Sequence, residues 1–169
     1  MDNDRYKRWV NASHKFGRIE PFFMILIQNL GRVDSRLVFE DSVFLKLTEE
    51  QMGTIECATA LTDRMTLSYL WVLGGYEFVR TLAQRLAGQP FKDEVVGVKH
   101  AFNRLRIPLA KFEAASRSPD DSPIAYPAIN SLDGIAWQLG RETFITRLEL
   151  SNQLLDMVER YEEQPQIPE

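Results

Sequence analysis

The segment from Thr48 to Phe112 constrains the fold more than any other part of the chain. Thr48-Glu49-Glu50-Gln51 has the capping-box pattern that begins helices. Apolar or small residues then recur in steps of three and four, the period of an α-helix. They are Ile55, Ala58, Thr62, Met65, Tyr69, Val72, Tyr76, Val79, Ala83 and Leu86. The pattern predicts one long helix, and Gly74-Gly75 inside it indicates a kink or a close helix–helix contact, because two glycines weaken a helix.

A short connection follows this helix. Gly88 suits a left-handed helix cap, Pro90 cannot continue the helix, and Asp93 can begin the next one. Apolar residues again recur in steps of three and four at Val95, Val98, Phe102, Leu105, Leu109 and Phe112. Two helices joined so closely pack antiparallel. We therefore predict a helical hairpin of residues 50–87 with residues 93–116, and expect Pro108 to kink the second helix.

The remaining segments are less well specified. Residues 4–16 indicate a short polar helix, while the apolar run 22–27 and residues 36–47 fit a helix or a strand equally well. Prolines and aspartates predict a loop over 118–134. Ile135, Trp137 and Leu139 alternate with smaller or polar residues, which allows a short strand. A final helix is expected to begin at Glu142 or Ser151 and to end near Tyr161.

These elements predict an all-α fold. We expect a bundle of about five helices around the hairpin, with room for one short β-hairpin near 135–147. The 169 residues fit a single domain, assigned to 1–163, followed by a flexible tail of residues 164–169.

Composition limits the cellular setting. The chain contains one cysteine, Cys57, so no disulfide framework is expected. The polar N-terminus has no apolar signal-peptide core, and the run 22–27 is too short to span a membrane. The expected location is the cytoplasm, without membrane association.

The sequence contains few residues that could form a metal site or supply a catalytic nucleophile. With one cysteine and two histidines, His14 and His100, a closed zinc site is excluded, and neither histidine has the glutamate three residues earlier that helical di-iron sites use. We predict no metal and no cofactor. Cys57 is interpreted as a buried, inert thiol. Catalytic residues stay unassigned, and the sequence leaves open whether the protein is an enzyme.

The first candidate binding site lies on the long helix. Glu77 and Arg80 are one turn apart on an otherwise apolar stretch that also holds Trp71 and Tyr76. A buried ion requires a partner. Glu77 and Arg80 therefore either bond to each other or hold a ligand beside Trp71 and Tyr76.

The second candidate site is a basic helix face. Residues 80–117 hold eight basic and three acidic residues, whereas residues 118–169 hold ten acidic and three basic ones. On the second helix of the hairpin the cations and a histidine surround the apolar seam: Lys99, His100, Arg104, Arg106 and Lys111. Such a set can bind RNA or another polyanion, since phosphates need cationic donors, or it can be an ordinary solvated face.

One short stretch resembles a known family. Arg8 precedes His14 by six residues, and this spacing is similar to the Arg-to-His spacing of HEPN-superfamily ribonucleases. Trp9 stands where those enzymes usually carry a polar residue after the arginine, and the stretch lies near the N-terminus instead of on a late helix. The similarity covers seven residues and implies only that an RNA-cleaving role belongs among the alternatives.

The predicted function follows from the absence of a catalytic signature. We expect a non-enzymatic interaction or regulatory module that self-associates into a homo-oligomer, with further protein partners unassigned. Aromatic residues support this expectation, because Tyr69, Trp71, Tyr76 and Phe78 supply more aromatic surface than one helix easily buries. The alternative is an RNA- or nucleotide-acting protein that uses the basic helix face.

Overall fold

The computed structural model describes residues 1–162 and is predominantly helical. The helices are α1 (Asn3–Ser13), α2 (Pro21–Phe44), α3 (Glu49–Met52), α4 (Ile55–Arg85), α5 (Lys92–Lys111) and α6 (Arg147–Arg160), with a 3-10 turn, η1, at His14–Phe16. Between α5 and α6 lie strands β1 (Tyr126–Asn130), β2 (Gly134–Gln138) and β3 (Phe144–Thr146). The predicted tail 164–169 falls outside the described residues.

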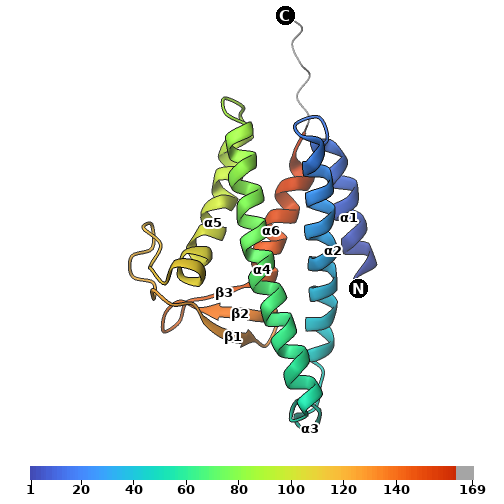
Figure 1. The fold of residues 1–169 in the computed structure, drawn as a ribbon, viewed down its shortest axis with the longest axis vertical. Coiled ribbons are helices and arrows are strands. Elements are labelled where there is room, and N and C mark those ends of the chain that lie inside the picture. The colour runs from blue at the N-terminus through green and yellow to red at the C-terminus, as the bar shows by residue number, and fades with distance from the viewer. Residues whose placement is uncertain (163–169) are drawn as a thin grey trace, which may run out of the picture.

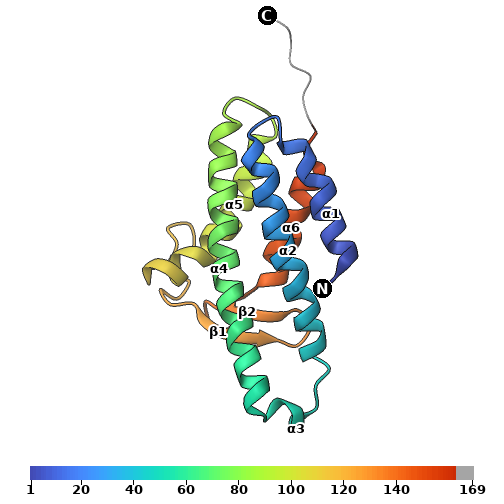
Figure 2. The same cartoon turned by 45° about the vertical axis from the view of Figure 1, so that its right-hand side comes forward.

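The predicted helical hairpin is confirmed as the antiparallel pair α4 and α5 (Figure 1). Gly75 allows the two helices to approach closely, since a Cβ atom there would lie 2.5 Å from Cε1 of Phe102 on α5. Of the two reasons expected for the glycine pair, the close contact is therefore the one observed. The end of α5 runs at an angle to the rest of that helix in Figure 2, as expected from Pro108 within it.

The long helix begins later than predicted. The capping box at Thr48 is present, but it opens only the single turn α3, which ends at Gly53. A second cap then begins α4, where the hydroxyl of Thr54 accepts a hydrogen bond from the backbone N–H of Cys57. The ambiguous run 22–27 and most of 36–47 are helical and belong to α2, because Glu20 caps and Pro21 begins one continuous helix there.

The prediction of an all-α fold was wrong in one respect, because the protein also contains a small β-sheet. The three strands form an antiparallel sheet in the order β1-β2-β3. The hairpin predicted near 135–147 is present as β2 and β3, with Trp137 opposite Ile145. Strand β1, however, was predicted as loop because it contains Pro127, which an edge strand tolerates. The central strand β2 is buried from Gly134 to Trp137 and contacts α2, α4 and α6.

The last helix begins at neither predicted position. Its N-cap is Thr146, whose hydroxyl accepts a hydrogen bond from the backbone N–H of Glu149, so α6 follows β3 without a loop. Its apolar face packs into the core formed by α1, α4 and α5. Just after α6, the ring of Tyr161 contacts Phe16 of η1 and Phe91, which directly precedes α5. Because α6 packs against α1 at one edge and against β2, it lies between the N-terminal helices and the sheet.

The lower tip of the molecule is built differently from the rest. Figures 1 and 2 show that α3 and the adjoining ends of α2 and α4 extend beyond α1, α5 and α6. Several apolar side chains of this tip are exposed: Phe39, Val43, Met52 and Ile55.

Candidate binding groove and its buried charged floor

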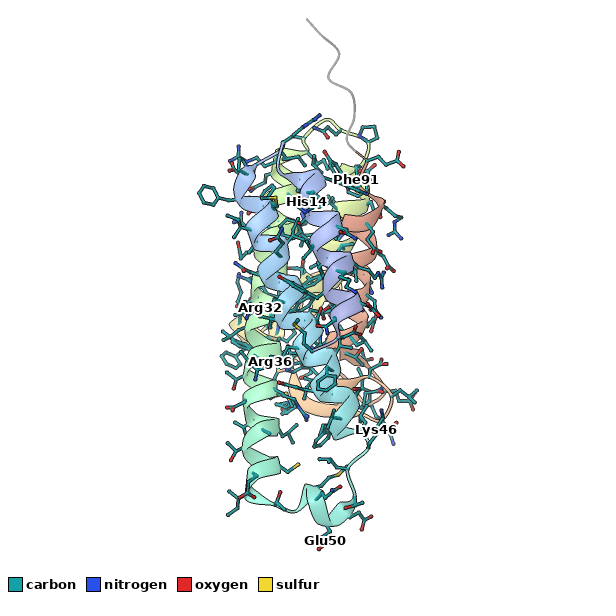
Figure 3. The ribbon with its side chains drawn as sticks, turned by 90° about the vertical axis from the view of Figure 1, so that its right-hand side faces the viewer. His14, Arg32, Arg36, Lys46, Glu50 and Phe91 are labelled. Carbon is teal, nitrogen blue, oxygen red and sulfur yellow. The ribbon has the colours of Figure 1, made fainter. Side chains whose placement is uncertain are left out.

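A groove of about 340 Å³ runs between α2 and α4 near the lower tip. Its apolar walls come from both helices and the turn after α2: Phe39, Val43, Phe44, Leu47, Cys57 and Ala60. Four charged residues line it as well, Arg36 and Glu40 on α2 and Asp63 and Arg64 on α4. Figure 3 shows this side of the molecule, with Arg36 projecting from α2 and Glu50 marking the tip at α3. The volume is in the usual range of ligand and side-chain pockets.

Arg64 forms the floor of the groove and is only 6% exposed. Its Nη1 donates a hydrogen bond of 3.1 Å to the carbonyl oxygen of Glu40, and its guanidinium lies 4.2 Å from the centroid of the Phe44 ring. Its Nε is 3.6 Å from Oδ1 of Asp41, too long for a hydrogen bond. Within residues 1–162, Nε and Nη2 have no hydrogen-bond partner. The guanidinium is thus desolvated and sparsely satisfied.

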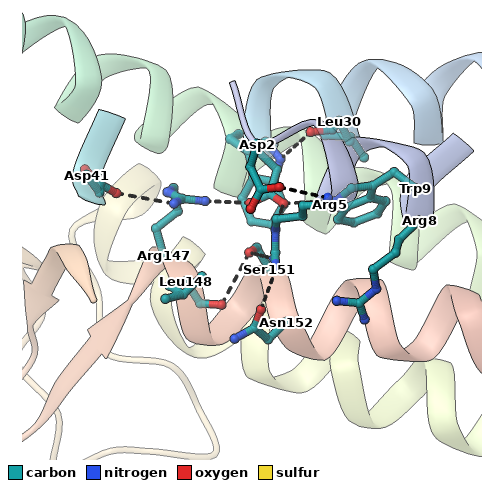
Figure 4. Close-up of polar contacts among 12 residues, drawn as sticks. Asp2, Arg5, Arg8, Trp9, Leu30, Asp41, Arg147, Leu148, Ser151 and Asn152 are labelled. Atoms are coloured by element: carbon teal, nitrogen blue, oxygen red, sulfur yellow. Dashed lines mark hydrogen bonds and ion pairs between the residues drawn. The ribbon is translucent and has the colours of Figure 1, made fainter. Parts of the chain in front are cut away.

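Arg64 adjoins a buried ionic cluster that joins α1, α2 and α6 (Figure 4). Asp34 is fully buried and accepts three hydrogen bonds, from Nε of Arg5, from Nε1 of Trp9 at 2.9 Å and from Nη1 of Arg147 at 2.7 Å. The fully buried Arg147 also donates from Nη2 to Asp41 at 3.3 Å. A charge removed from water is tolerated when it is paired and hydrogen-bonded. Each of these groups has such a partner, although Oδ1 of Asp41 and Nε of Arg147 have none within residues 1–162.

Helix geometry explains why the cluster forms. Asp34 and Asp41 are seven residues apart, so they lie on the same buried face of α2 as Leu30, Leu37 and Phe44. Arg147 is the first residue of α6, placed beside them by the direct step from β3 into the helix. Arg5 closes the cluster toward solvent, with further hydrogen bonds from Nη1 to Asn152 and from Nη2 to Ser151.

The pKa of Asp41 is raised above its ordinary value of 3.8, because burial outweighs the attraction of Arg147 and Arg64. The folded protein therefore binds a proton at Asp41 more readily than the unfolded chain does. Between pH 3.8 and the raised folded-state pKa, this group's contribution to the free energy of unfolding must decline as the pH rises.

An Asp41→Asn variant should remove that contribution. We expect its free energy of unfolding to fall less steeply than that of the wild type as the pH is raised from about 4, whatever its absolute stability. Urea denaturation of both proteins across the range from pH 4 to 7 measures the two slopes. Parallel curves would show that Asp41 keeps the same proton affinity in both states.

The structure places the predicted ligand-site residues apart from this groove. Trp71 is buried, and its Nε1 donates to the carbonyl oxygen of Leu30 at 3.0 Å. Glu77 and Arg80 bond to each other at 2.7 Å, one of the two predicted alternatives, but both side chains are about half exposed instead of buried. Tyr76 lies under the guanidinium of Arg106 at 4.9 Å. None of these four predicted residues lines the α2–α4 groove.

The residues of the basic face differ in how far they are already engaged. Arg104 makes a two-pronged ion pair with Asp121 at 2.7 and 2.9 Å, and Arg106 covers Tyr76. Lys99 and His100 are half-buried, and Lys111 is exposed. Arg8, from the stretch similar to HEPN ribonucleases, pairs with Glu159 of α6 at 2.7 Å, which raises the pKa of its guanidinium. The structure thus assigns structural partners to three of these arginines.

The groove and the cluster were not predicted from the sequence. Cys57, expected to be buried, is half-buried and lines the groove. One sequence feature pointed toward the cluster: Asp34 and Asp41 interrupt an apolar helix face with a spacing of two helical turns. Within residues 1–162 no three potential metal-binding side chains come together, and no helix there is both long and apolar enough to cross a bilayer.

Comparisons of the chain with protein-family models, with curated proteins and with solved structures found no match.

Proposed function

We propose that the protein is a non-enzymatic interaction module that self-associates through the α2–α4 groove. The observation that carries this proposal is the exposed apolar wall at the lower tip, where Phe39 is 47% and Val43 46% exposed. Exposed apolar surface rimmed by charged residues is typical of protein contact sites. As a chain with a single cysteine, the module is expected to act in a reducing compartment, the cytoplasm.

A second copy of the chain fits the groove better than an unrelated partner. A twofold-symmetric contact uses the same patch on both copies, so the patch must complement itself. The patch offers both a groove and, in Phe39 and Val43, half-exposed apolar side chains that a second copy can cover. It also complements itself in charge, because each helix contributes one basic and one acidic residue: Arg36 and Glu40 on α2, Asp63 and Arg64 on α4. Two such patches do not repel each other.

The test is the mass in solution. We expect the wild-type protein to show twice the chain mass of 19.5 kDa at micromolar concentration, and a Val43→Glu variant to be monomeric, because it places a charge in the desolvated centre of the contact. Light scattering over a concentration series, with circular dichroism to confirm folding, measures both. Phe22→Glu is the matched control, since Phe22 is 74% exposed in the first turn of α2, at the opposite end of that helix from Val43.

Two outcomes would count against self-association through this groove. The first is a wild-type protein that stays monomeric up to millimolar concentration. The second is a dimer that persists in Val43→Glu or is lost equally in Phe22→Glu, because the contact would then lie elsewhere on the surface.

A further inference from the structure

A second pocket, of about 240 Å³, lies beside α5 and is independent of the groove. It forms because Phe112 ends α5 in the left-handed conformation, with φ of 57°, and turns the chain back along the helix. Ala115 is buried at 3% exposure and anchors the returning segment, while the ion pair of Arg104 with Asp121 holds it from the other side. As a result Arg117, which the sequence did not single out, reaches His100.

Hydrogen-bond donors dominate the lining of this pocket. His100, Asn103 and Arg104 come from α5, and Arg117 and Ser118 from the returning segment. Nη1 of Arg117 lies 3.1 Å from Nδ1 of His100. A guanidinium only donates, so Nδ1 accepts and the proton of the neutral ring is on Nε2. Both the imidazole N–H and the remaining N–H groups of Arg117 are then available to a ligand.

The charges around the pocket are not balanced locally. Asp121 neutralises Arg104, but Arg117 and the nearby Lys99 form no ion pair within residues 1–162. Burial, and then the charges of Arg117 and Lys99, lower the pKa of His100 and so favour its neutral form. The pKa of Arg104 is raised chiefly by its hydrogen bond to Asp121, and the negative charge of Glu149 on α6 raises it further. An anion with several acceptor oxygens matches this arrangement.

We propose that this pocket binds the phosphate group of a small phosphomonoester. The planar fork of Arg117 suits two phosphate oxygens, and Ser118 and Asn103 can complete the contacts. A nucleic-acid strand fits less well, because the segment that carries Arg117 also carries Glu113 and Asp120, which repel a continuous polyanion. A single phosphate group meets only the basic side of the segment.

Binding should be coupled to the uptake of a proton. A dianion placed beside His100 favours the charged imidazolium, which then donates from both ring nitrogens and turns Nδ1 away from Arg117 toward the ligand. The proton is taken from solvent, and no bond to phosphorus changes. Affinity for the phosphate dianion should accordingly rise as the pH falls from the raised His100 pKa of the occupied pocket toward the lower His100 pKa of the unliganded protein.

Nuclear magnetic resonance titration of the two histidines tests the proposal. Inorganic phosphate and phenyl phosphate, each added at constant ionic strength, should raise the pKa of His100 by about one unit, the usual effect of a nearby opposite charge. The resonances of His14, the other histidine of the chain, should not move when phosphate is added at constant pH. An unchanged His100, or an equal change at both histidines, would overturn the proposal.

Two variants and one further ligand complete the test. Arg117→Gln should abolish the effect of phosphate on His100, whereas Lys111→Gln, which removes the same charge from the exposed end of α5, should retain it. A single-stranded RNA oligomer without terminal phosphates should leave His100 unchanged. Loss of the effect in both variants, or a response to RNA that exceeds the response to phosphate, would contradict a phosphomonoester site. Neither result depends on the oligomeric state.

Discussion

Replacing Arg147 by methionine is expected to lower the free energy of unfolding by about 3–5 kcal/mol. Methionine has a similar length and packs well, so the loss comes from electrostatics and not from a cavity. It removes the donor to Asp34 at 2.7 Å and to Asp41 at 3.3 Å, and both carboxylates remain buried. Asp34 keeps Arg5 and Trp9, but Asp41 keeps only the longer contact with Arg64 and the backbone N–H of Ile135.

The matched control for this variant is Arg8→Met. Arg8 also pairs α1 with α6 through Glu159, but its side chain is 47% exposed, and an exposed ion pair contributes at most about 1 kcal/mol. Urea denaturation at neutral pH measures both variants against the wild type. Similar losses for Arg147→Met and Arg8→Met would refute the assignment of the buried cluster as the main polar link between the N-terminal helices and α6.

Replacing Gly75 by alanine is expected to destabilise the protein by about 1–3 kcal/mol, although alanine is the better helix former. The added methyl group would lie 2.5 Å from the ring of the fully buried Phe102, so α4 and α5 must separate or the ring must leave its position. Gly97→Ala is the opposite control, because Gly97 is an exposed residue of α5 with open space around it. It should stabilise the protein by about 1 kcal/mol.

Thermal denaturation of the two glycine variants therefore gives shifts of opposite sign if α4 and α5 pack as described. A double variant, Gly75→Ala with Phe102→Leu, should be less destabilised than the sum of the single changes, because the smaller side chain makes room for the methyl group. Stabilisation of the protein by Gly75→Ala would mean that the two helices do not touch at this point.

The parts of the fold that the sequence predicted are those specified by local patterns. The hairpin of α4 and α5 follows from apolar residues at helical spacing and from the turn residues between the helices. The starting residue of α4 did not follow, since Thr48 and Thr54 both have cap chemistry and only the intervening Gly53 separates a single turn from the long helix. Strand β1 escaped prediction because its residues Tyr126-Pro127-Ala128 carry no alternation, and pairing with β2 supplies its structure.

The candidate sites depend on contacts between residues far apart in the chain. Arg147 is 113 residues from Asp34 and 106 from Asp41, and no spacing rule connects such positions. Arg117 reaches His100 only because Phe112 adopts a left-handed conformation that its sequence context does not specify. Glu77 and Arg80 were predicted to form a site because their neighbours in the sequence are apolar, yet both side chains are about half exposed on α4. In all three cases the position of the side chain depends on tertiary packing, which local sequence patterns do not encode.

The position of Arg147 also has a consequence for how the protein folds during its synthesis. A nascent chain leaves the ribosome from its N-terminus, so α1, α2 and α4 emerge while Arg147 is still being added or is held in the exit tunnel. Until then Asp34 has only Arg5 and Trp9 as partners and Asp41 lacks its closest counterion, so closing the N-terminal helices would bury two carboxylates without their shared donor. The N-terminal helices should therefore complete their packing only after α6 is released.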